Sequence, residues 1–315
     1  MKIVVLDAAT LGADIDLSPL EALGTLTVYP NTAPEEVSSR IADQNVIVSN
    51  KVRLNESNLK DAKQMRLICL AATGFDCVDT AYCRSRGIGV CNVPGYSTHS
   101  VAQLTVAMAL SLGTHLNQYR GFVHDGSYTR SGIANRLDPV WYELSGKTWG
   151  VIGGGNIGQE VAKIVTAMGC HVIMCRRKED PNYETVDLDT LCARADILSV
   201  HVALNEQTRS MIGRTQIGLM KKNAVFINVA RGAVADEAAL AEAILEGRLG
   251  GLGVDVYTVE PFTEDHPFQS ILDRDNVCLT PHMAWGSYEA RNRCLRIVAQ
   301  NIRAFQNGEK QNRVE

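Results

Sequence analysis

The sequence predicts an α/β protein with two doubly wound parallel sheets, one in each of two domains. Short runs rich in β-branched residues alternate with amphipathic stretches, which is the rhythm of a parallel sheet covered by helices. This rhythm occurs twice, on either side of a long apolar stretch. The chain has 315 residues, of which 45% are hydrophobic, so it is too long for one small core and can fill two.

The first series of short runs lies before the apolar stretch and predicts the sheet of the first domain. Helical patterns, such as the one over residues 34–42, separate the runs. Strands are expected at residues 3–6, 26–29, 46–49, 67–71 and 89–93.

The apolar stretch itself predicts a helix over residues 101–110 that is buried on several sides. Helices of this kind bridge domains or subunits, and the aromatic segment 139–142 offers a second apolar surface. Together they predict a homodimer. The alternative is that both segments are buried within one subunit, because interfaces and cores share their composition.

The second series predicts a second parallel sheet, followed by a helix over about residues 287–306 with no strand after it. Its strands are expected at residues 148–152, 172–174, 197–202, 225–229, 251–255 and 277–280.

The composition excludes several kinds of partner. A formal net charge of -4 gives no electrostatic reason to bind nucleic acid or an acidic membrane surface. The nine cysteines include no Cys-x-x-Cys pair, so they are interpreted as reduced thiols of a cytoplasmic protein and not as disulfides or a metal site. No stretch has the length of a membrane span, and the first residues lack a signal-peptide pattern. A small-molecule partner is therefore favoured.

A glycine-rich segment between an apolar run and a helical pattern provides the context of a dinucleotide-binding fingerprint. Gly153 permits the tight turn, Gly155 lets the backbone approach a pyrophosphate, and Gly158 allows the helix to pack on the strand. Asn156 and Ile157 place amides at the positive end of that helix. The alternative is a tight turn that binds nothing.

The residues after the strand expected at 172–174 indicate whether the coenzyme is NAD(H) or NADP(H). An NAD site normally has Asp or Glu there to accept from the ribose hydroxyls, but this chain has Arg176 and Arg177. Arginines can pair with a 2'-phosphate, so NADP(H) is favoured and NAD(H) is possible. The alternative is that the two arginines and Lys178 form a solvated loop.

Three residues beyond later strands could supply the chemistry for reducing a 2-oxo acid. Adding hydride to a carbonyl carbon makes its oxygen negative, so the site needs a proton donor, a cation for the substrate, and a group that keeps the donor protonated. His282 suits the donor, Arg231 can hold a carboxylate bidentately, and Glu260 can pair with the imidazole. Each alone has a simpler interpretation, as a packed histidine, a surface arginine and a solvated acid.

Taken together, the motifs resemble the D-2-hydroxyacid dehydrogenase family over nearly the whole chain. The segments 228–232, 255–261 and 280–284 occur in this order in that family, which assigns Arg231, Glu260 and His282 the roles above. The implied architecture is a Rossmann coenzyme domain and a smaller flavodoxin-like substrate domain that is discontinuous in sequence. The implied boundaries are 1–95 with 287–315 for the substrate domain and 96–286 for the NAD(P)-binding domain.

The resemblance also implies contacts made by less distinctive residues. Further coenzyme contacts are expected at His201, Ala203, Val229, Ala230, Asp255 and Ala284. Substrate contacts are expected at Asn50, Lys51, Thr73, Gly74 and Trp285, beside Arg231 and His282. His201 could equally be a core histidine, and the histidines outside these motifs, including His266, are interpreted as structural.

The function predicted from this resemblance is NAD(P)H-dependent reduction of a small 2-oxo acid, such as hydroxypyruvate or glyoxylate, to the D-2-hydroxy acid. The segments around Trp285 and Lys51 resemble the glycerate dehydrogenase and hydroxypyruvate reductase branch. A phosphoglycerate-type dehydrogenase and a dinucleotide-sensing corepressor on the same fold are alternatives. Formate dehydrogenase is a more distant one, because that branch has glutamine where Glu260 stands.

Overall fold

The computed structural model describes residues 1–315, which divide into two units. Unit 1 comprises residues Met1–Ser97 and Trp285–Glu315, and unit 2 comprises Thr98–Ala284. Each unit is built on its own parallel sheet, so the predicted α/β fold class is confirmed. None of the helices combines the length and the apolar character that a membrane span requires.

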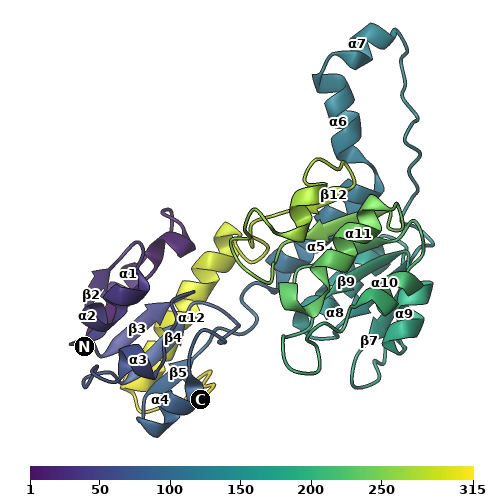
Figure 1. Ribbon diagram of the computed structural model, residues 1–315. Coiled ribbons are helices and arrows are strands. Elements are labelled where there is room, and N and C mark those ends of the chain that lie inside the picture. The colour runs from purple at the N-terminus through teal and green to yellow at the C-terminus, as the bar shows by residue number, and fades with distance from the viewer. The chain divides into compact units, whose positions relative to one another are not determined.

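Unit 1 contains a five-stranded sheet in the order β2-β1-β3-β4-β5, with every neighbouring pair parallel (Figure 1). This is the strand order of flavodoxin-like doubly wound sheets. The strands are β1 (Lys2–Val5), β2 (Thr25–Val28), β3 (Val46–Ser49), β4 (Leu67–Leu70) and β5 (Gly89–Cys91). The helices are η1 (Ala8–Leu11), α1 (Ser18–Glu21), η2 (Pro34–Glu36), α2 (Val37–Ile41), α3 (Glu56–Leu59), α4 (Thr80–Ser85) and α12 (Tyr288–Gln306).

Helix α12 belongs to the core of unit 1 although it follows unit 2 in the chain. Its buried face includes Leu295, Val298 and Ile302, which pack in one cluster with strand residues such as Val5 and Cys69. The other face of the sheet is covered by a second cluster. Burial on both faces explains why the strands are continuous apolar runs without polar alternation.

Unit 2 contains a seven-stranded parallel sheet in the order β12-β11-β10-β9-β6-β7-β8. The strand order reverses at β6, which is where doubly wound sheets bind ligands, at the carboxyl ends of the strands. The strands are β6 (Thr148–Ile152), β7 (His171–Cys175), β8 (Glu184–Thr185), β9 (Ile197–Val200), β10 (Val225–Asn228), β11 (Gly251–Val254) and β12 (Val277–Leu279). The short β8 was not predicted from the sequence.

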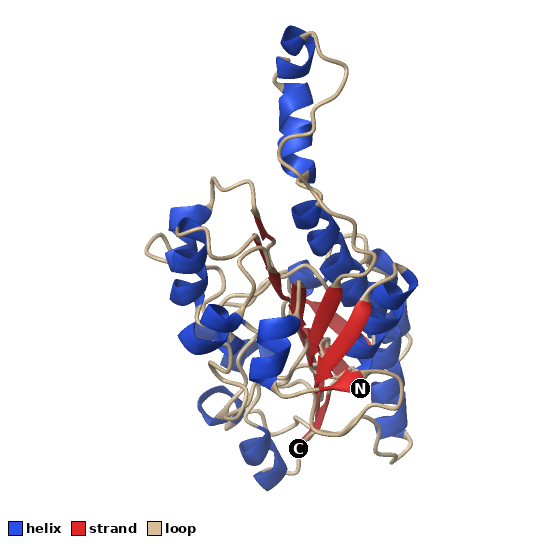
Figure 2. Ribbon diagram, turned by 90° about the vertical axis from the view of Figure 1, so that its right-hand side faces the viewer, coloured by secondary structure: helices blue, strands red, loops and turns tan.

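The helices of unit 2 cover both faces of this sheet (Figure 2). They are α5 (Thr98–Gly113), α6 (Leu116–His124), α7 (Ser127–Ser131), α8 (Asn156–Ala167), α9 (Leu188–Arg194), α10 (Arg214–Leu219), η3 (Gly232–Val234), α11 (Glu237–Leu245) and η4 (Pro267–Ile271).

Helix α5 contains the predicted apolar helix and is buried largely within unit 2, where it packs against α8, β10 and β11. The two helices that follow it, α6 and α7, project away from the sheet, and the chain returns along an extended segment (Figure 1). We call residues 116–142 the arm. Its large apolar side chains are exposed, among them Leu137 and Trp141. The sequence did not predict that these residues leave the body of the unit.

Candidate active site

Arg231, Glu260 and His282 lie beyond the carboxyl ends of three neighbouring strands of unit 2, β10, β11 and β12. Strands β10 and β11 pair in register, as do β11 and β12. Parallel pairing therefore brings the loops that carry the three side chains to one edge of the sheet.

The imidazole of His282 is held by the carboxylate of Glu260. His282 Nδ1 lies 2.6 Å from Glu260 Oε2, and the other oxygen, Oε1, accepts the backbone N–H of Tyr257 at 3.0 Å. Both side chains are partly exposed, at 21% for His282 and 29% for Glu260. Because the carboxylate takes Nδ1, Nε2 is the ring nitrogen that can donate a proton to a substrate.

Asp255 fixes the turn that presents His282. It is fully buried at the end of β11, and its carboxylate accepts the Thr280 hydroxyl at 2.5 Å and the N–H groups of Met283 and Ala284 at 2.8 and 2.9 Å. Burial raises the pKa of Asp255, and these three donors offset part of that effect. The turn needs this support because His282 has a left-handed backbone, with a φ of 51°, which is strained for a residue other than glycine.

The loop carrying Arg231 is fixed by Asn228, which is buried. The Asn228 side chain donates to the Arg231 carbonyl at 2.9 Å and accepts the Ala230 N–H at 3.0 Å. At Gly232 a side chain would not fit, since a Cβ would lie 2.2 Å from the Thr258 nitrogen. The Arg231 loop therefore packs directly on the loop that leads to Glu260.

The glycine turn after β6 has the conformation that its sequence predicted. Gly153 has a φ of +102°, and a Cβ there would lie 2.7 Å from the carbonyl oxygen of His201. A Cβ at Gly158 would lie 2.0 Å from the Gly153 oxygen, so helix α8 packs tightly on the turn. A Cβ at Gly155 would meet nothing within 4 Å. The turn is thus closed toward the protein and open at Gly155.

The arginines beyond β7 have protein partners. Arg176 forms an ion pair with Asp180, whose side chain is 2% exposed, and a Cβ on Gly154 would lie 2.8 Å from Arg176 Cδ. The Arg176 side chain therefore lies against the glycine turn. The Asn182 amide, with smaller contributions from Gln159 and Arg176, lowers the pKa of Asp180.

Arg177 lies on the exposed side of the same loop and donates to Gln207 Oε1 at 2.9 Å. His201, beyond β9, is oriented into the protein, where Nε2 lies 2.9 Å from Ser199 Oγ. Burial lowers the pKa of His201 to about 3, so its ring is neutral. Its backbone carbonyl lies against the glycine turn. Four other predicted coenzyme residues lie in loops beyond β9, β10 and β12, namely Ala203, Val229, Ala230 and Ala284.

The predicted substrate residues of unit 1 lie beyond β3 and β4. Asp7, beyond β1, accepts the N–H of Asn50 at 3.0 Å and that of Lys51 at 2.7 Å. Thr73 donates its hydroxyl to the Val93 carbonyl at 2.9 Å, and Gly74 follows it. Trp285 packs edge to face on Tyr96, with ring centroids 6.2 Å apart.

Comparison with known proteins identifies the family. Residues 106–284 match the model of the "D-isomer specific 2-hydroxyacid dehydrogenase, NAD binding domain" family. A hydroxypyruvate reductase of Blautia hydrogenotrophica is 33% identical over 317 residues, covering 98% of both chains. The chain belongs to the D-2-hydroxyacid dehydrogenase family. The predicted resemblance is confirmed, and so is the prediction that this protein is an NAD(P)-dependent oxidoreductase.

Solved structures of related dehydrogenases and reductases share the fold of the whole chain. An acyclic imino acid reductase in complex with NADPH and D-Arg has a TM-score of 0.89 at 26% identity and covers 100% of both chains. A D-lactate dehydrogenase from Aquifex aeolicus with NAD and lactic acid has a TM-score of 0.86 at 28% identity and covers 98% of this chain and 96% of its own. Both coenzymes therefore occur among structural neighbours.

The glycine turn of this dehydrogenase fits the pyrophosphate of a dinucleotide. The open face at Gly155 admits a ligand to the backbone, and the first amides of α8, at Asn156 and Ile157, lie at the positive end of a 12-residue helix. Bound NAD(P)H would supply the hydride. No group of His, Cys, Asp and Glu side chains is arranged to hold a metal ion.

Sequence reasoning missed Asp180 and Asp7, and it predicted Asp255 as a coenzyme contact without its bonds to the turn of His282. Asp180 pairs with Arg176, Asp7 binds the amides of the Asn50 loop, and Asp255 binds the turn that carries His282. The signal available for each was an acid at or shortly beyond a strand end. The partners are up to 44 residues away in sequence, so the pattern alone could not identify them.

Proposed function

We propose that this dehydrogenase reduces a small 2-oxo acid, such as hydroxypyruvate or glyoxylate, to the D-2-hydroxy acid, with His282 as proton donor. Hydride adds to the carbonyl carbon, and the carbonyl oxygen takes the proton from Nε2 of His282. Arg231 holds the substrate carboxylate, and Glu260 stabilises the protonated imidazole until the proton is transferred. The observation that carries the proposal is the 2.6 Å contact between His282 and Glu260 beside the loop of Arg231.

The remaining predicted contacts are part of the same proposal. The backbone of His201 and Ala203, together with Val229, Ala230, Asp255 and Ala284, would line the coenzyme. Asn50, Lys51, Thr73, Gly74 and Trp285 would contact the substrate. Asp255 is already bonded to the turn around His282, which supports a role in holding that turn beside any contact with the nicotinamide. The choice of hydroxypyruvate is supported by the name of the Blautia hydrogenotrophica relative.

For the coenzyme we infer a preference for NADP(H) over NAD(H). Arg176 lies against the glycine turn and Arg177 is exposed beside it, so both can face a 2'-phosphate. The ion pair with Asp180 balances part of the charge of Arg176 and holds its side chain beside the glycine turn. The neighbour solved with NADPH supports this inference, and the one solved with NAD keeps NAD(H) as the alternative.

We further infer a homodimer formed through the arm. The arm exposes large apolar side chains that a monomer rarely leaves in solvent, including Leu137, Val140 and Tyr142. A cavity of about 270 Å³ between α5 and residues 141–145 adds a recess that an apolar group could fill. All nine cysteines are free, which supports a reducing compartment such as the cytoplasm.

The test of the substrate proposal is a set of initial rates. Hydroxypyruvate, glyoxylate, pyruvate and 3-phosphohydroxypyruvate are each assayed with NADPH and with NADH, and the chirality of the product is determined. The proposal expects the highest kcat/KM for hydroxypyruvate or glyoxylate and a D product. A higher kcat/KM for the phosphorylated substrate, or an L product, would overturn it.

A further inference from the structure

Tyr257 and Thr258 contact the segments of all three proposed catalytic residues. The Tyr257 N–H donates to Glu260 Oε1 at 3.0 Å. Gly232, next to Arg231, packs so closely on the peptide between Tyr257 and Thr258 that a Cβ would lie 2.2 Å from the Thr258 nitrogen. The Tyr257 hydroxyl donates to the carbonyl of Thr280, in the turn that carries His282, at 2.9 Å. A shift of this peptide would therefore displace Glu260 first and the other two loops with it.

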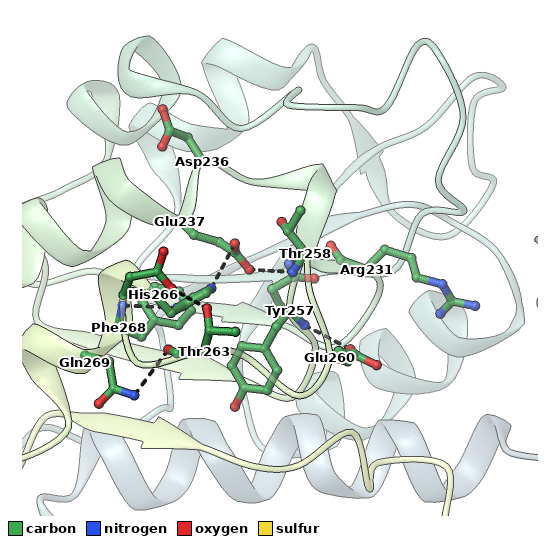
Figure 3. Close-up of polar contacts among 12 residues, drawn as sticks. Arg231, Asp236, Glu237, Tyr257, Thr258, Glu260, Thr263, His266, Phe268 and Gln269 are labelled. Carbon is green, nitrogen blue, oxygen red and sulfur yellow. Dashed lines mark hydrogen bonds and ion pairs between the residues drawn. The ribbon is translucent and has the colours of Figure 1, made fainter. Parts of the chain in front are cut away.

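A carboxylate from a neighbouring helix holds the same peptide. Glu237, the first residue of α11, accepts the Thr258 N–H on Oε1 at 2.9 Å (Figure 3). Its second oxygen, Oε2, lies 3.2 Å from Nε2 of His266. The side chains of Glu237 and His266 are only 12% and 7% exposed. A charge-assisted bond to a backbone amide is stronger than a neutral one, and burial protects it from water.

The tautomer of His266 follows from its second nitrogen. Nδ1 accepts the N–H of Phe268 at 3.2 Å, so the proton is on Nε2 and points at Glu237. The rings of Tyr257, Phe262 and Phe268 surround the imidazole, with centroids 4.8 to 6.2 Å apart in the cluster. His266 is thus a fixed donor that orients the carboxylate of Glu237.

Capping of the helix does not account for the direction of the Glu237 side chain. The N-cap of α11 is Asp236, whose side chain accepts the Ala239 N–H at 2.9 Å. In Figure 3 the side chain of Asp236 points away from the loop, and that of Glu237 points toward Thr258. The Glu237 carboxylate is therefore committed to the Thr258 loop and to His266.

We propose that Glu237, oriented by His266, is a positioning residue that fixes the Tyr257–Thr258 peptide and thereby places Glu260 against His282. The proposal rests on the catalytic roles given above for Glu260 and His282. It assigns a second His–Glu pair to the active site, one that acts on the loop and touches no substrate. Misplacing a reacting group by about 1 Å can cost on the order of 100-fold in rate, so a fixed loop matters to turnover.

The test compares three variants of the full-length protein. Glu237→Ala removes the acceptor, and we expect kcat to fall by roughly 10-fold to 100-fold. The Kd of the coenzyme should stay the same, because the glycine turn proposed to bind it follows β6, whereas Glu237 and Thr258 lie beyond β10 and β11. Glu237→Gln keeps an oxygen that can accept from Thr258 but turns its NH2 group toward the N–H of His266, so it should recover kcat in part. Glu242→Ala is the matched control, since Glu242 lies on the same helix and pairs with Arg214 at 2.5 Å. It should match the wild type.

A measurement without turnover separates this proposal from the proposed function. The imidazole of His282 is followed by the NMR titration of its Cε1–H resonance in wild type and variants. The carboxylates that act on this ring are Glu260, at 2.6 Å, and the buried Asp255. Loosening Glu260 by Glu237→Ala should move the titration midpoint to lower pH, and Glu237→Gln, which keeps the acceptor for Thr258, should restore it in part.

The possible results distinguish a failure of the proposed function from a failure of the positioning role of Glu237. If the wild type reduces no 2-oxo acid, the proposed function fails, while the titration still tests the role of Glu237. If Glu237→Ala is folded and leaves both kcat and the His282 titration unchanged, the positioning role is wrong. Equal losses in Glu237→Ala and Glu242→Ala would also overturn it, because the effect would then be a general one of helix α11.

Discussion

At the scale of single residues, the contact between His282 and Glu260 leads to the first prediction. His282→Ala should lower kcat by roughly two to four orders of magnitude, because it removes the proton donor. Coenzyme binding should be nearly intact, since the glycine turn follows β6 and His282 follows β12. Turnover by absorbance and coenzyme Kd by fluorescence titration check both parts. A variant with rates near those of the wild type would contradict the assignment.

Glu260→Gln tests the partner of the imidazole. Reduction needs the protonated ring, so activity falls as pH rises and the ring loses its proton. The carboxylate favours the protonated ring and extends activity to higher pH, whereas an amide lacks that charge. The upper limb of the pH profile of kcat/KM should therefore move to lower pH. Glu242→Gln, which also loses one carboxylate, should leave the profile in place.

Arg176→Asp tests the coenzyme inference. We expect the wild type to have a higher kcat/KM with NADPH than with NADH, and the variant to reverse that order. The change removes a charge-assisted partner of a 2'-phosphate, worth roughly 1.5 to 3 kcal/mol, and adds repulsion. Turnover at saturating coenzyme should change little.

Lys178→Asp is the control for this substitution, because it makes the same change of charge at an exposed position of the same loop. A wild type without preference, or a ratio that Arg176→Asp does not move, would show that the pairing with Asp180 is the whole role of this arginine.

The residues of the candidate site differ in how far the sequence could predict them. Arg231, Glu260 and His282 could be proposed from the sequence because each has a chemically distinctive side chain and follows a predicted strand. The hydrogen bonds that hold their loops could not be predicted, because Asp255 and Glu237 bind backbone amides 21 to 29 residues away. A backbone amide has no sequence signature. His266 was interpreted as structural from the sequence, and its contact with Glu237 likewise could be identified only from the fold.

At the scale of elements, strands were easier to predict than helices. Strands buried on both faces, such as β3 and β4, are continuous apolar runs that stand out in the sequence. Helices α6 and α7 were missed because they bury no residue in unit 2, so they stand outside the alternation of buried strand and covering helix on which the prediction rested. The two-residue strand β8 is too short to show any period.

The arm carries the prediction that belongs to this scale. We expect the wild type to sediment as a dimer at micromolar concentration and the double variant Leu137→Glu, Val140→Glu to sediment as a monomer. Both side chains are largely exposed in the single chain, so the charges should not disturb its fold. Leu219→Glu, at an exposed apolar position outside the arm, is the control and should stay dimeric. A monomeric wild type would refute the dimer.

At the scale of the whole molecule, the α/β class and the two parallel sheets could be predicted because a doubly repeated rhythm is a property of the entire chain. The pattern alone does not give the pairing order within each sheet, since that order depends on contacts between distant segments; it was implied only by the family resemblance. The order β2-β1-β3-β4-β5 places the first strand inside the sheet of unit 1, with a neighbour on each side.

Helix α12 has a consequence for how the protein is made. A ribosome releases residues 98–284 before residues 285–315, so a nascent chain can complete the core of unit 2 while that of unit 1 still lacks Leu295, Val298 and Ile302. Each of these side chains contributes roughly 1.5 to 3 kcal/mol when buried. We expect a chain ending at Ala284 to keep residues 98–284 resistant to limited proteolysis while residues 1–97 are digested. Equal resistance of both parts would contradict this expectation. Digestion of residues 1–97 would mean that the part of the chain that is synthesised first stays exposed longest to chaperones and proteases.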